Sequence, residues 1–281
     1  MGAAFKVVTL LAVFLNWSPL SRAQTVSTVA YEGFNYGNAA LASQNGGYGW
    51  SGAWNSASDY STSATGLSYS GLTATGGSIT WSSDGTNVYD QGNRSLATGV
   101  SSANTSVAYI QFLANLGTQT GGGTPNLRLS FQGSATGAVG NNGAANWALL
   151  DNGLNVLTGG TSTVALAGLT LVVMRIDYSN SSSSLWLNPN LGTFDFGSPT
   201  GANLTVSGFA PAFDNLNFIS RSSSSFDEIT VMTAASAIPE PATAAAIIGS
   251  VALGAAMFFR RKFPTRGSSA ARENRAADPA A

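Results

Sequence analysis

Short apolar runs that alternate with period two constrain the fold more than any other feature of this sequence. Between residues 24 and 237, runs rich in Val, Leu, Tyr, Phe and Thr are separated by Gly, Asn and Ser. No stretch there repeats apolar residues at helical spacing over three turns. The alternation is clearest in "NLRLSFQGS", where Leu127, Leu129 and Phe131 share one face and polar residues share the other. This run predicts a strand with one core face and one solvated face.

Two longer runs predict further strands, and the second is expected to be a central strand that emerges at an edge of the buried region. In "SVAYIQFL" both alternating sets are mainly apolar, and "LTLVVMRIDYS" stays apolar on both faces until Arg175 and Asp177. Further candidate strands are 27–34, 71–77, 78–83, 146–152, 184–188, 215–220 and 226–232. Ten or more short strands with loops of four to ten residues predict an all-β fold, an antiparallel two-sheet sandwich of the jelly-roll kind.

Composition excludes several kinds of chemistry. The chain has no Cys and no His, so it has no Ser-His-Asp triad, imidazole zinc site, thiolate nucleophile or disulfide. Residues 24–237 contain ten acidic side chains and no Lys; their only basic residues are Arg94, Arg128, Arg175 and Arg221. This negative balance argues against nucleic acid as a partner.

Residues 1–23 have the layout of a secretory signal peptide. Lys6 supplies the charged start, "VVTLLAVFLNW" the apolar middle, and "SPLSRA" the small residues before cleavage after Ala23. The apolar run has 11 residues, short of the roughly 20 that a membrane-spanning helix needs. We therefore expect export with cleavage, and an exported chain without cysteine suggests a bacterial source.

The C-terminal part combines a proline-flanked joint, an apolar segment and a basic cluster. Residues 242–259 are 18 uncharged residues, which as a helix would measure roughly 27 Å and cross a thin bilayer. The cluster Arg260, Arg261 and Lys262 follows and is expected to stay on the cytoplasmic side. The preceding Pro239, Glu240 and Pro241 predict an extended joint between the body and the span.

This order resembles the PEP-CTERM sorting signal of Gram-negative bacteria that produce exopolysaccharide. The resemblance covers residues 238–262 and implies an exosortase as processing partner, contact with membrane lipid, and delivery to the cell surface or extracellular matrix. The chain continues through a polar, Ala-rich tail at 263–281, which we expect to be disordered, whereas the family usually ends soon after the basic cluster. An ordinary C-terminal anchor without sorting is the alternative.

The body, residues 24–237, resembles the concanavalin A-like, LamG-like sandwich domains attached to such signals. The resemblance rests on "YEGFNYGNAALASQNGGYGWSGAW", "RIDYSNSSSSLWLNPNLG" and "FDEITVM". It implies that the first strand, around Ala30 to Phe34, pairs with the last, around Phe226 to Met232.

Three tryptophans are candidate sugar contacts, because sugar rings stack on exposed aromatic rings. Trp186 is favoured by its pattern, since Leu185 and Leu187 take the opposite face. Trp50 and Trp54 lie in "NGGYGWSGAW", which is equally compatible with a loop folded over the edge of the core. Packing is the favoured role for any one of them.

The carboxylates do not suggest catalysis. A retaining glycosidase needs two of them roughly 5 Å apart, whereas the adjacent Asp227 and Glu228 should point to opposite faces of one strand. Asp227, on the side of Ile229 and Val231, is expected to be half-buried and bonded to loop amides. Calcium is an open alternative at Asp59, Asp84, Asp90 and Asp151, but turn formation explains these residues and no metal ligand is assigned.

The leading hypothesis is therefore a non-catalytic surface protein, exported, anchored in the inner membrane and sorted into a polysaccharide-rich envelope. The alternative is a carbohydrate-binding, lectin-like module on the same scaffold, with exopolysaccharide as a candidate partner. A glycosidase of unfamiliar type is a third reading.

Overall fold

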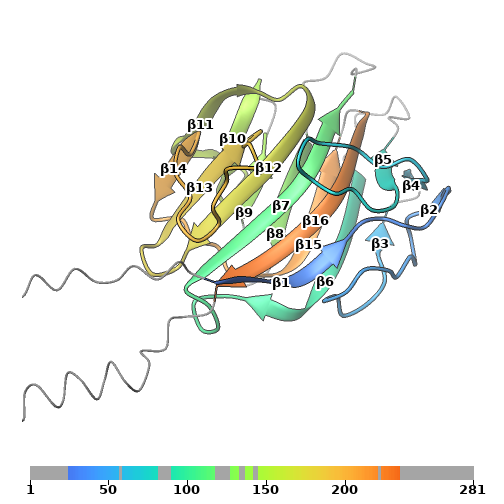
Figure 1. Ribbon diagram of the computed structural model, residues 1–281, viewed down its shortest axis with the longest axis horizontal. Helices are drawn as coiled ribbons and strands as arrows, with labels where there is room; N and C mark the ends of the chain where they lie inside the picture. Colours follow the sequence, from blue (N-terminus) through green and yellow to red (C-terminus); the bar gives the residue numbers. More distant parts are fainter. Residues whose placement is uncertain are drawn as a thin grey trace, which may run out of the picture. The chain divides into compact units, whose positions relative to one another are not determined.

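A computed structural model describes residues 25–56, 59–81, 90–117, 127–132, 137–141, 145–220 and 223–234 (Figure 1). Within these ranges no helix is long and apolar enough to span a membrane. The predicted signal peptide with its cleavage at Ala23, the Pro239–Pro241 joint, the apolar segment 242–259 and the basic cluster all lie outside the described residues. They stay predictions.

Two antiparallel sheets form the body, as the alternation predicted. The nine-stranded sheet has the order β14 (Leu204–Ser207), β13 (Ser182–Leu187), β12 (Gly168–Asp177), β7 (Val107–Leu116), β16 (Ser224–Ala234), β5 (Ser78–Trp81), β4 (Tyr60–Ser63) and β2 (Ala39–Ala40), with β1 (Val26–Glu32) also paired to β16. The seven-stranded sheet has the order β11 (Val156–Ala165), β10 (Asn146–Leu150), β9 (Gly137–Gly140), β8 (Leu127–Gln132), β15 (Phe213–Ser220), β6 (Asp90–Val100) and β3 (Asn55–Ser56).

The main core lies between the sheets, and a second apolar layer covers the outer face of the nine-stranded sheet. β7 shows both: Ala108, Ile110 and Phe112 belong to the main core, while Tyr109 and Leu113 belong to the outer layer. β12 does the same with Val172 and Met174 on one side and Leu171 and Val173 on the other: both are central strands without a solvated face. The prediction that β12 is a central strand, apolar on both faces before Arg175, is therefore confirmed.

Two loops supply the outer layer. We call residues 64–77, between β4 and β5, the cover loop, and residues 188–203, between β13 and β14, the pocket loop. Both pack apolar side chains against the outer face of the nine-stranded sheet, and Figure 1 shows them crossing its strands. The packed side chains are Leu67, Tyr69 and Leu72 of the cover loop and Leu191, Phe194 and Phe196 of the pocket loop.

Two expectations from the sequence are wrong. Residues 71–77 form no strand, because Gly71 and Gly76 take left-handed φ values of 82° and 107° that break an extended run. The polar face of β8 is solvated only at Gln132, since Arg128 and Ser130 are 5% and 8% exposed. β8 lies inside the sheet, where Ser130 is flanked by Ala138 of β9 and by a residue of β15, so neighbouring side chains shield it.

The pairing of the first strand with the last is confirmed, with Ala30 of β1 opposite Val231 of β16. One edge of β16 pairs with β7, and the other edge changes partner along its length. β5 pairs with its start, Ser224–Phe226, and β1 pairs with its end, Ile229–Ala234. A β-bulge lies at this change of partner, with Glu228 at a φ of 52°.

Candidate functional site

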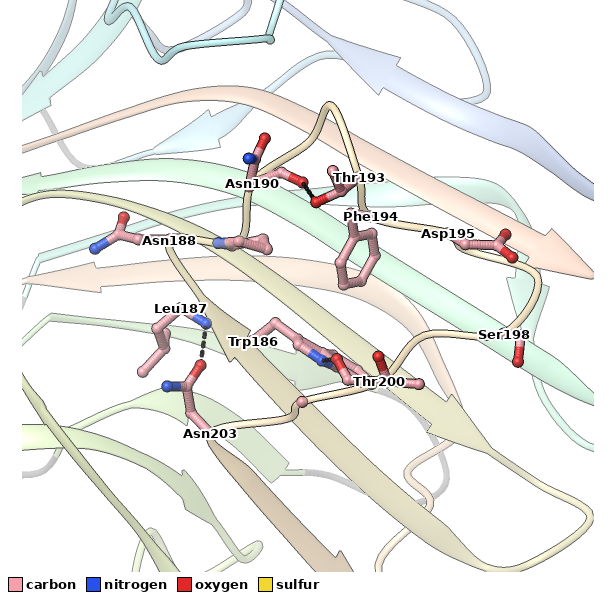
Figure 2. A pocket seen from close by; sticks show the side chains of 12 residues that line it. Trp186, Leu187, Asn188, Asn190, Thr193, Phe194, Asp195, Ser198, Thr200 and Asn203 are labelled. Atoms are coloured by element: carbon pink, nitrogen blue, oxygen red, sulfur yellow. Dashed lines mark hydrogen bonds between the residues drawn. The ribbon is translucent and has the colours of Figure 1, made fainter.

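A pocket of about 380 Å³ lies between the end of β13 and the pocket loop (Figure 2). It is lined by Trp186, Leu187, Asn188, Pro189, Asn190, Thr193, Phe194, Asp195, Ser198, Thr200, Gly201 and Asn203. All but the first two belong to the pocket loop, so the conformation of this one loop decides the shape of the site.

Aromatic rings form the base of the pocket. Trp186 and Phe194 meet edge to face with ring centroids 5.5 Å apart, and Phe194 meets Phe196 in the same way at 4.8 Å. Leu185 and Leu187 point into the main core, so the alternation of β13 turns Trp186 toward the pocket loop, as predicted. Trp186 is only 5% exposed, however, and its Nε1 donates to the carbonyl of Thr200 at 2.8 Å. The half-buried Phe194 therefore offers more ring surface to a ligand than Trp186.

Two asparagines fasten the ends of the pocket loop to the sheet. Asn188, at a φ of 55°, accepts a hydrogen bond from the Leu171 amide through Oδ1 at 2.9 Å. Asn203 accepts one from the Leu187 amide through Oδ1 at 2.7 Å, as Figure 2 shows. Among the described residues none accepts a bond from the Nδ2 of either asparagine, and both side chains are exposed. Each side-chain amide therefore holds the loop with its oxygen, and its nitrogen is left able to donate to a group outside the described residues.

The rim is polar and carries one charge. Asn190 and Asp195 accept loop amide bonds from Gly192 at 3.0 Å and from Gly197 at 2.8 Å, which shape the turn. Asp195 uses only Oδ1 for this bond, and no described residue donates to its Oδ2. The hydroxyls of Thr193, Ser198 and Thr200 complete the rim. None of the described residues that line the pocket is Lys or Arg.

Sequence reasoning found Trp186 but missed the rest of this site. The signal was present in "NPNLGTFDFGSPTGAN", where turn-forming residues alternate with two phenylalanines directly after a strand. Asn188, Asn203, Phe194 and Asp195 all lie in or beside that segment.

Trp50 and Trp54 lie elsewhere, in the loop that was equally compatible with packing on the core edge. Trp54 is 2% exposed and donates through Nε1 to Oε2 of Glu32 at 3.2 Å, while Trp50 donates to the Tyr31 carbonyl at 3.0 Å. The Arg94 guanidinium lies 5.2 Å from the Trp50 ring centroid and 5.7 Å from that of Trp54. Their indole N–H groups are thus committed to the protein itself.

A buried ion pair closes this second region. Arg94 contacts Glu32 through NH1, and both side chains are about 1% exposed. The guanidinium also donates to the Gly52 carbonyl at 2.7 Å and to Oδ1 of Asn45 at 2.6 Å. Glu32 in turn accepts a bond from the Tyr36 hydroxyl at 2.6 Å. Because the charges are paired and hydrogen-bonded, this cluster fixes the loop and leaves little for a ligand to bind.

Asp227 and Glu228 do not point to opposite faces, because the bulge adds a residue and turns both toward the cover loop. Phe226 and Ile229 both face the main core. Asp227 accepts bonds from the Leu67 amide at 2.7 Å and from the Glu228 amide at 2.8 Å. The expected bond to a loop amide is confirmed, but Asp227 is fully buried and does not share a side with Ile229.

Burial sets the protonation of this corner. It raises the pKa of Asp227 to about 7; its two amide bonds oppose the shift, while Glu228 and Glu32 reinforce it. Burial also raises the pKa of Tyr31 to about 12. Tyr31 is therefore protonated at neutral pH and donates to Oε2 of Glu228 at 2.7 Å.

The calcium alternative gains no ligand set. No group of three or more carboxylates that could hold a metal ion occurs within the described residues. Asp151 accepts the Asn155 amide bond at 2.8 Å, as a turn-forming residue does. Asp84 and the side chain of Asp90 lie outside the description, and Asp59 belongs to no metal-binding group there.

No family model matches the sequence, and no curated protein matches it. Solved structures of similar architecture include lectin II from Ulex europaeus, at 11% identity and a TM-score of 0.45, covering 74% of this chain and 100% of that one. Arcelin-5, a lectin-like defense protein from Phaseolus vulgaris, has 10% identity and a TM-score of 0.46, with 75% and 100% covered. A carbohydrate esterase from the Shiga toxin-encoding bacteriophage phi24B has 14% identity and a TM-score of 0.44, with 75% and 100% covered. Similarity at this level transfers no function to the chain.

Proposed function

We propose that the sandwich is a carbohydrate-binding module that takes a neutral, hydroxyl-rich glycan into the pocket at the pocket loop. The observation that carries this proposal is the pairing of an aromatic base with the side-chain nitrogens of Asn188 and Asn203, which have no acceptor among the described residues, and with hydroxyls around them. Sugars offer apolar ring faces and a rim of hydroxyls, so an aromatic surface framed by amides complements both. Asn188 and Asn203 donate through Nδ2, and Asp195 accepts through Oδ2.

The charge of the pocket favours neutral ligands over anionic ones. Among the described lining residues Asp195 is the single charged side chain, and none is basic and able to pair with a uronate, sulfate or phosphate group. An acidic polysaccharide would meet repulsion from Asp195 without compensation. A neutral hexose chain pays no such cost.

The arrangement of carboxylates supports binding without hydrolysis. Glycoside hydrolysis needs two carboxyl groups roughly 5 to 9.5 Å apart on either side of the scissile bond. Among the described residues that line the pocket, Asp195 is the only one with a carboxyl group. Asp227 and Glu228 are almost fully buried and accept bonds from protein donors, so neither reaches a sugar at the surface.

The sequence at both ends supplies the proposed location. We propose that residues 1–23 direct export, that 242–259 hold the chain in the inner membrane, and that an exosortase recognises Pro239, Glu240 and Pro241 for delivery to the cell surface or matrix. The order of joint, apolar segment and basic cluster supports this route. Replacing the three joint residues by alanine should leave the protein in the inner membrane at its uncleaved length. Equal surface delivery of that variant would contradict the sorting proposal.

Glycan binding is tested with the full chain on an array of neutral and acidic oligosaccharides, followed by titration with the best neutral ligand. The Phe194→Ala variant should weaken binding about tenfold, because an aromatic contact contributes about 0.5–1.5 kcal/mol beyond buried area. The matched control is Tyr48→Ala, which removes a ring that is 54% exposed outside the pocket. Absence of binding to every neutral glycan, or equal loss in both variants, would contradict the proposal.

A further inference from the structure

The pocket loop is supported unevenly along its length. Its later part is tied to the sheet, since Tyr109 donates to the Phe196 carbonyl and Trp186 to the Thr200 carbonyl. Residues 189–195 differ: within the described part of the chain, their only hydrogen bond to a residue outside the pocket loop comes from Tyr69, which donates to the Pro189 carbonyl at 3.2 Å. This segment includes five of the residues that line the pocket.

Apolar packing joins the two loops at the same place. A Cβ added to Gly71 of the cover loop would lie 3.3 Å from Cβ of Leu191, so the two backbones approach closely there. Tyr69, Leu72 and Leu191 pack in the same outer layer. The cover loop is thus the wall against which residues 189–192 rest.

The cover loop itself is fastened by the bulge of β16. Its Leu67 amide donates to Asp227 at 2.7 Å, and its Thr75 amide donates to Glu228 at 2.6 Å. Tyr31 of β1 contacts both Glu228 and the Thr75 hydroxyl. Because the bulge turns both carboxylates to one side, the two ends of this loop are held by adjacent residues of one central strand.

We propose that Tyr69 is a positioning residue for the pocket, through which the anchored cover loop sets the conformation of residues 189–195. This inference rests on the proposed function, because it assigns to the cover loop the placement of Asn190, Thr193, Phe194 and Asp195 around a bound glycan. Binding affinity then depends on a loop that touches no ligand.

The test compares Tyr69→Phe with Tyr178→Phe in the full chain. Tyr178 also donates its hydroxyl to a proline carbonyl, that of Pro211 at 2.9 Å, but it packs against the main core. The two variants therefore remove the same kind of bond at different places. Amide hydrogen exchange is followed at Gly192 and Thr193, whose N–H groups donate within the turn at Asn190.

Tyr69→Phe should speed exchange at Gly192 and Thr193 roughly twofold to tenfold, the range expected for one lost hydrogen bond. Exchange at residues 196–203 and the melting temperature should change little, and Tyr178→Phe should leave Gly192 and Thr193 unaffected. A second variant, Asp227→Asn, should speed exchange in both the cover loop and residues 189–195. Unchanged exchange at Gly192 and Thr193 in Tyr69→Phe would overturn the positioning role.

Glycan titration separates this inference from the proposed function. If laminarihexaose or another neutral hexose chain binds, Tyr69→Phe should weaken its affinity by a similar factor while Tyr178→Phe does not. If no glycan binds the wild type, the proposed function fails, yet the exchange result still decides whether Tyr69 positions the loop. Weaker binding of equal size in both variants would overturn the inference.

Discussion

The regions around the candidate tryptophans, the loop with Trp50 and Trp54 and the pocket beside Trp186 of β13, use their polar groups in opposite ways. Around Trp50 and Trp54, the buried Arg94–Glu32 pair and the indole N–H groups satisfy each other inside the protein. Around Trp186, two asparagines of the pocket loop accept bonds from amides of β12 and β13 through their side-chain oxygens, and their side-chain nitrogens have no acceptor among the described residues. The difference shows that aromatic content alone does not identify a binding site. The proposed binding site differs in having side-chain nitrogens and a carboxylate oxygen without described protein partners.

The largest expected effect tests the region around Trp50 and Trp54, where Arg94 and Glu32 form a buried ion pair. Arg94→Met should lower the free energy of unfolding by about 3–5 kcal/mol, because it leaves Glu32 buried without its charged partner. Arg175→Met is the control: Arg175 contacts Asp177 at 2.9 Å with its own side chain 24% exposed, so its loss should cost at most about 1 kcal/mol. Urea denaturation measures both. Similar losses of unfolding free energy in the two variants would show that the Arg94–Glu32 pair does not stabilise the region around Trp50 and Trp54.

The second prediction exchanges the roles of two aromatic residues. Trp50→Ala should destabilise the protein by about 2–3 kcal/mol, since it empties part of the core edge, and leave glycan affinity unchanged. Phe194→Ala should do the opposite: it should reduce the affinity for glycan and lower the free energy of unfolding less than Trp50→Ala does. Denaturation and titration on both variants give the four values. A loss of glycan affinity in Trp50→Ala would break the contrast between the regions.

The third prediction concerns the effect of pH on stability and on the attachment of the cover loop, which packs beside the pocket loop. Folded Asp227, with its pKa raised to about 7 from 3.8, binds a proton more tightly than unfolded Asp227. Its contribution to the free energy of unfolding is therefore greatest below about pH 4 and falls, by on the order of 2 kcal/mol, as pH rises to about 7. The charged or titratable groups that face it are Glu228 on its own strand and Glu32 and Tyr31 on β1. The described parts of β5 and β7 bring no carboxylate or basic side chain beside it, and the cover loop adds only Tyr69.

Asp227→Asn should remove this fall between pH 4 and pH 7 in denaturation curves. At the same time the Leu67 amide should be less protected from exchange in the wild type at pH 5.5 than at pH 8, after correction for intrinsic rates, because a protonated acid accepts more weakly than a carboxylate. The global and local effects thus have opposite signs. An identical pH slope in the Asn variant would contradict the assignment.

The smallest effect concerns charge selectivity. Asp195→Asn should raise the affinity for polygalacturonate about twofold at low salt, since it removes a repulsion at an exposed site that ions also screen. Asp214→Asn, at an exposed position of β15 outside the pocket, is the matched control. An equal gain in both variants would indicate net charge and not the pocket.

Strand alternation predicted the layers of the body well where both sheet neighbours are regular. It failed at β16 because no residue type in "FDEITVM" indicates that Glu228 takes a left-handed conformation. The one extra residue of the bulge places Asp227 on the face opposite to the predicted one. It also missed β6, whose sequence "DQGNRSLATGV" reads as polar. Arg94 of β6 points inward because it forms an ion pair with Glu32, which is distant in the sequence.

Of the candidate site, only the facing of Trp186 was predicted. Trp186 follows from period two, which is a local property of β13. Asn188 and Asn203 hold the pocket loop by accepting hydrogen bonds from amides of the sheet. The hydrogen bond from Tyr69 comes from a loop more than a hundred residues earlier in the sequence. Such distant partners leave no pattern in a single sequence.

The position of β16 also has a consequence for biogenesis. This strand is the last one that the structure describes, yet it sits in the interior of the nine-stranded sheet between β7 and the strands β5 and β1. The sheet therefore cannot be completed before the chain has emerged as far as Ala234, and pairings between strands so distant in the sequence predict slow folding. Until then the edges of β1 and β7 that pair with β16 stay open, and such unpaired strand edges favour aggregation unless they are shielded.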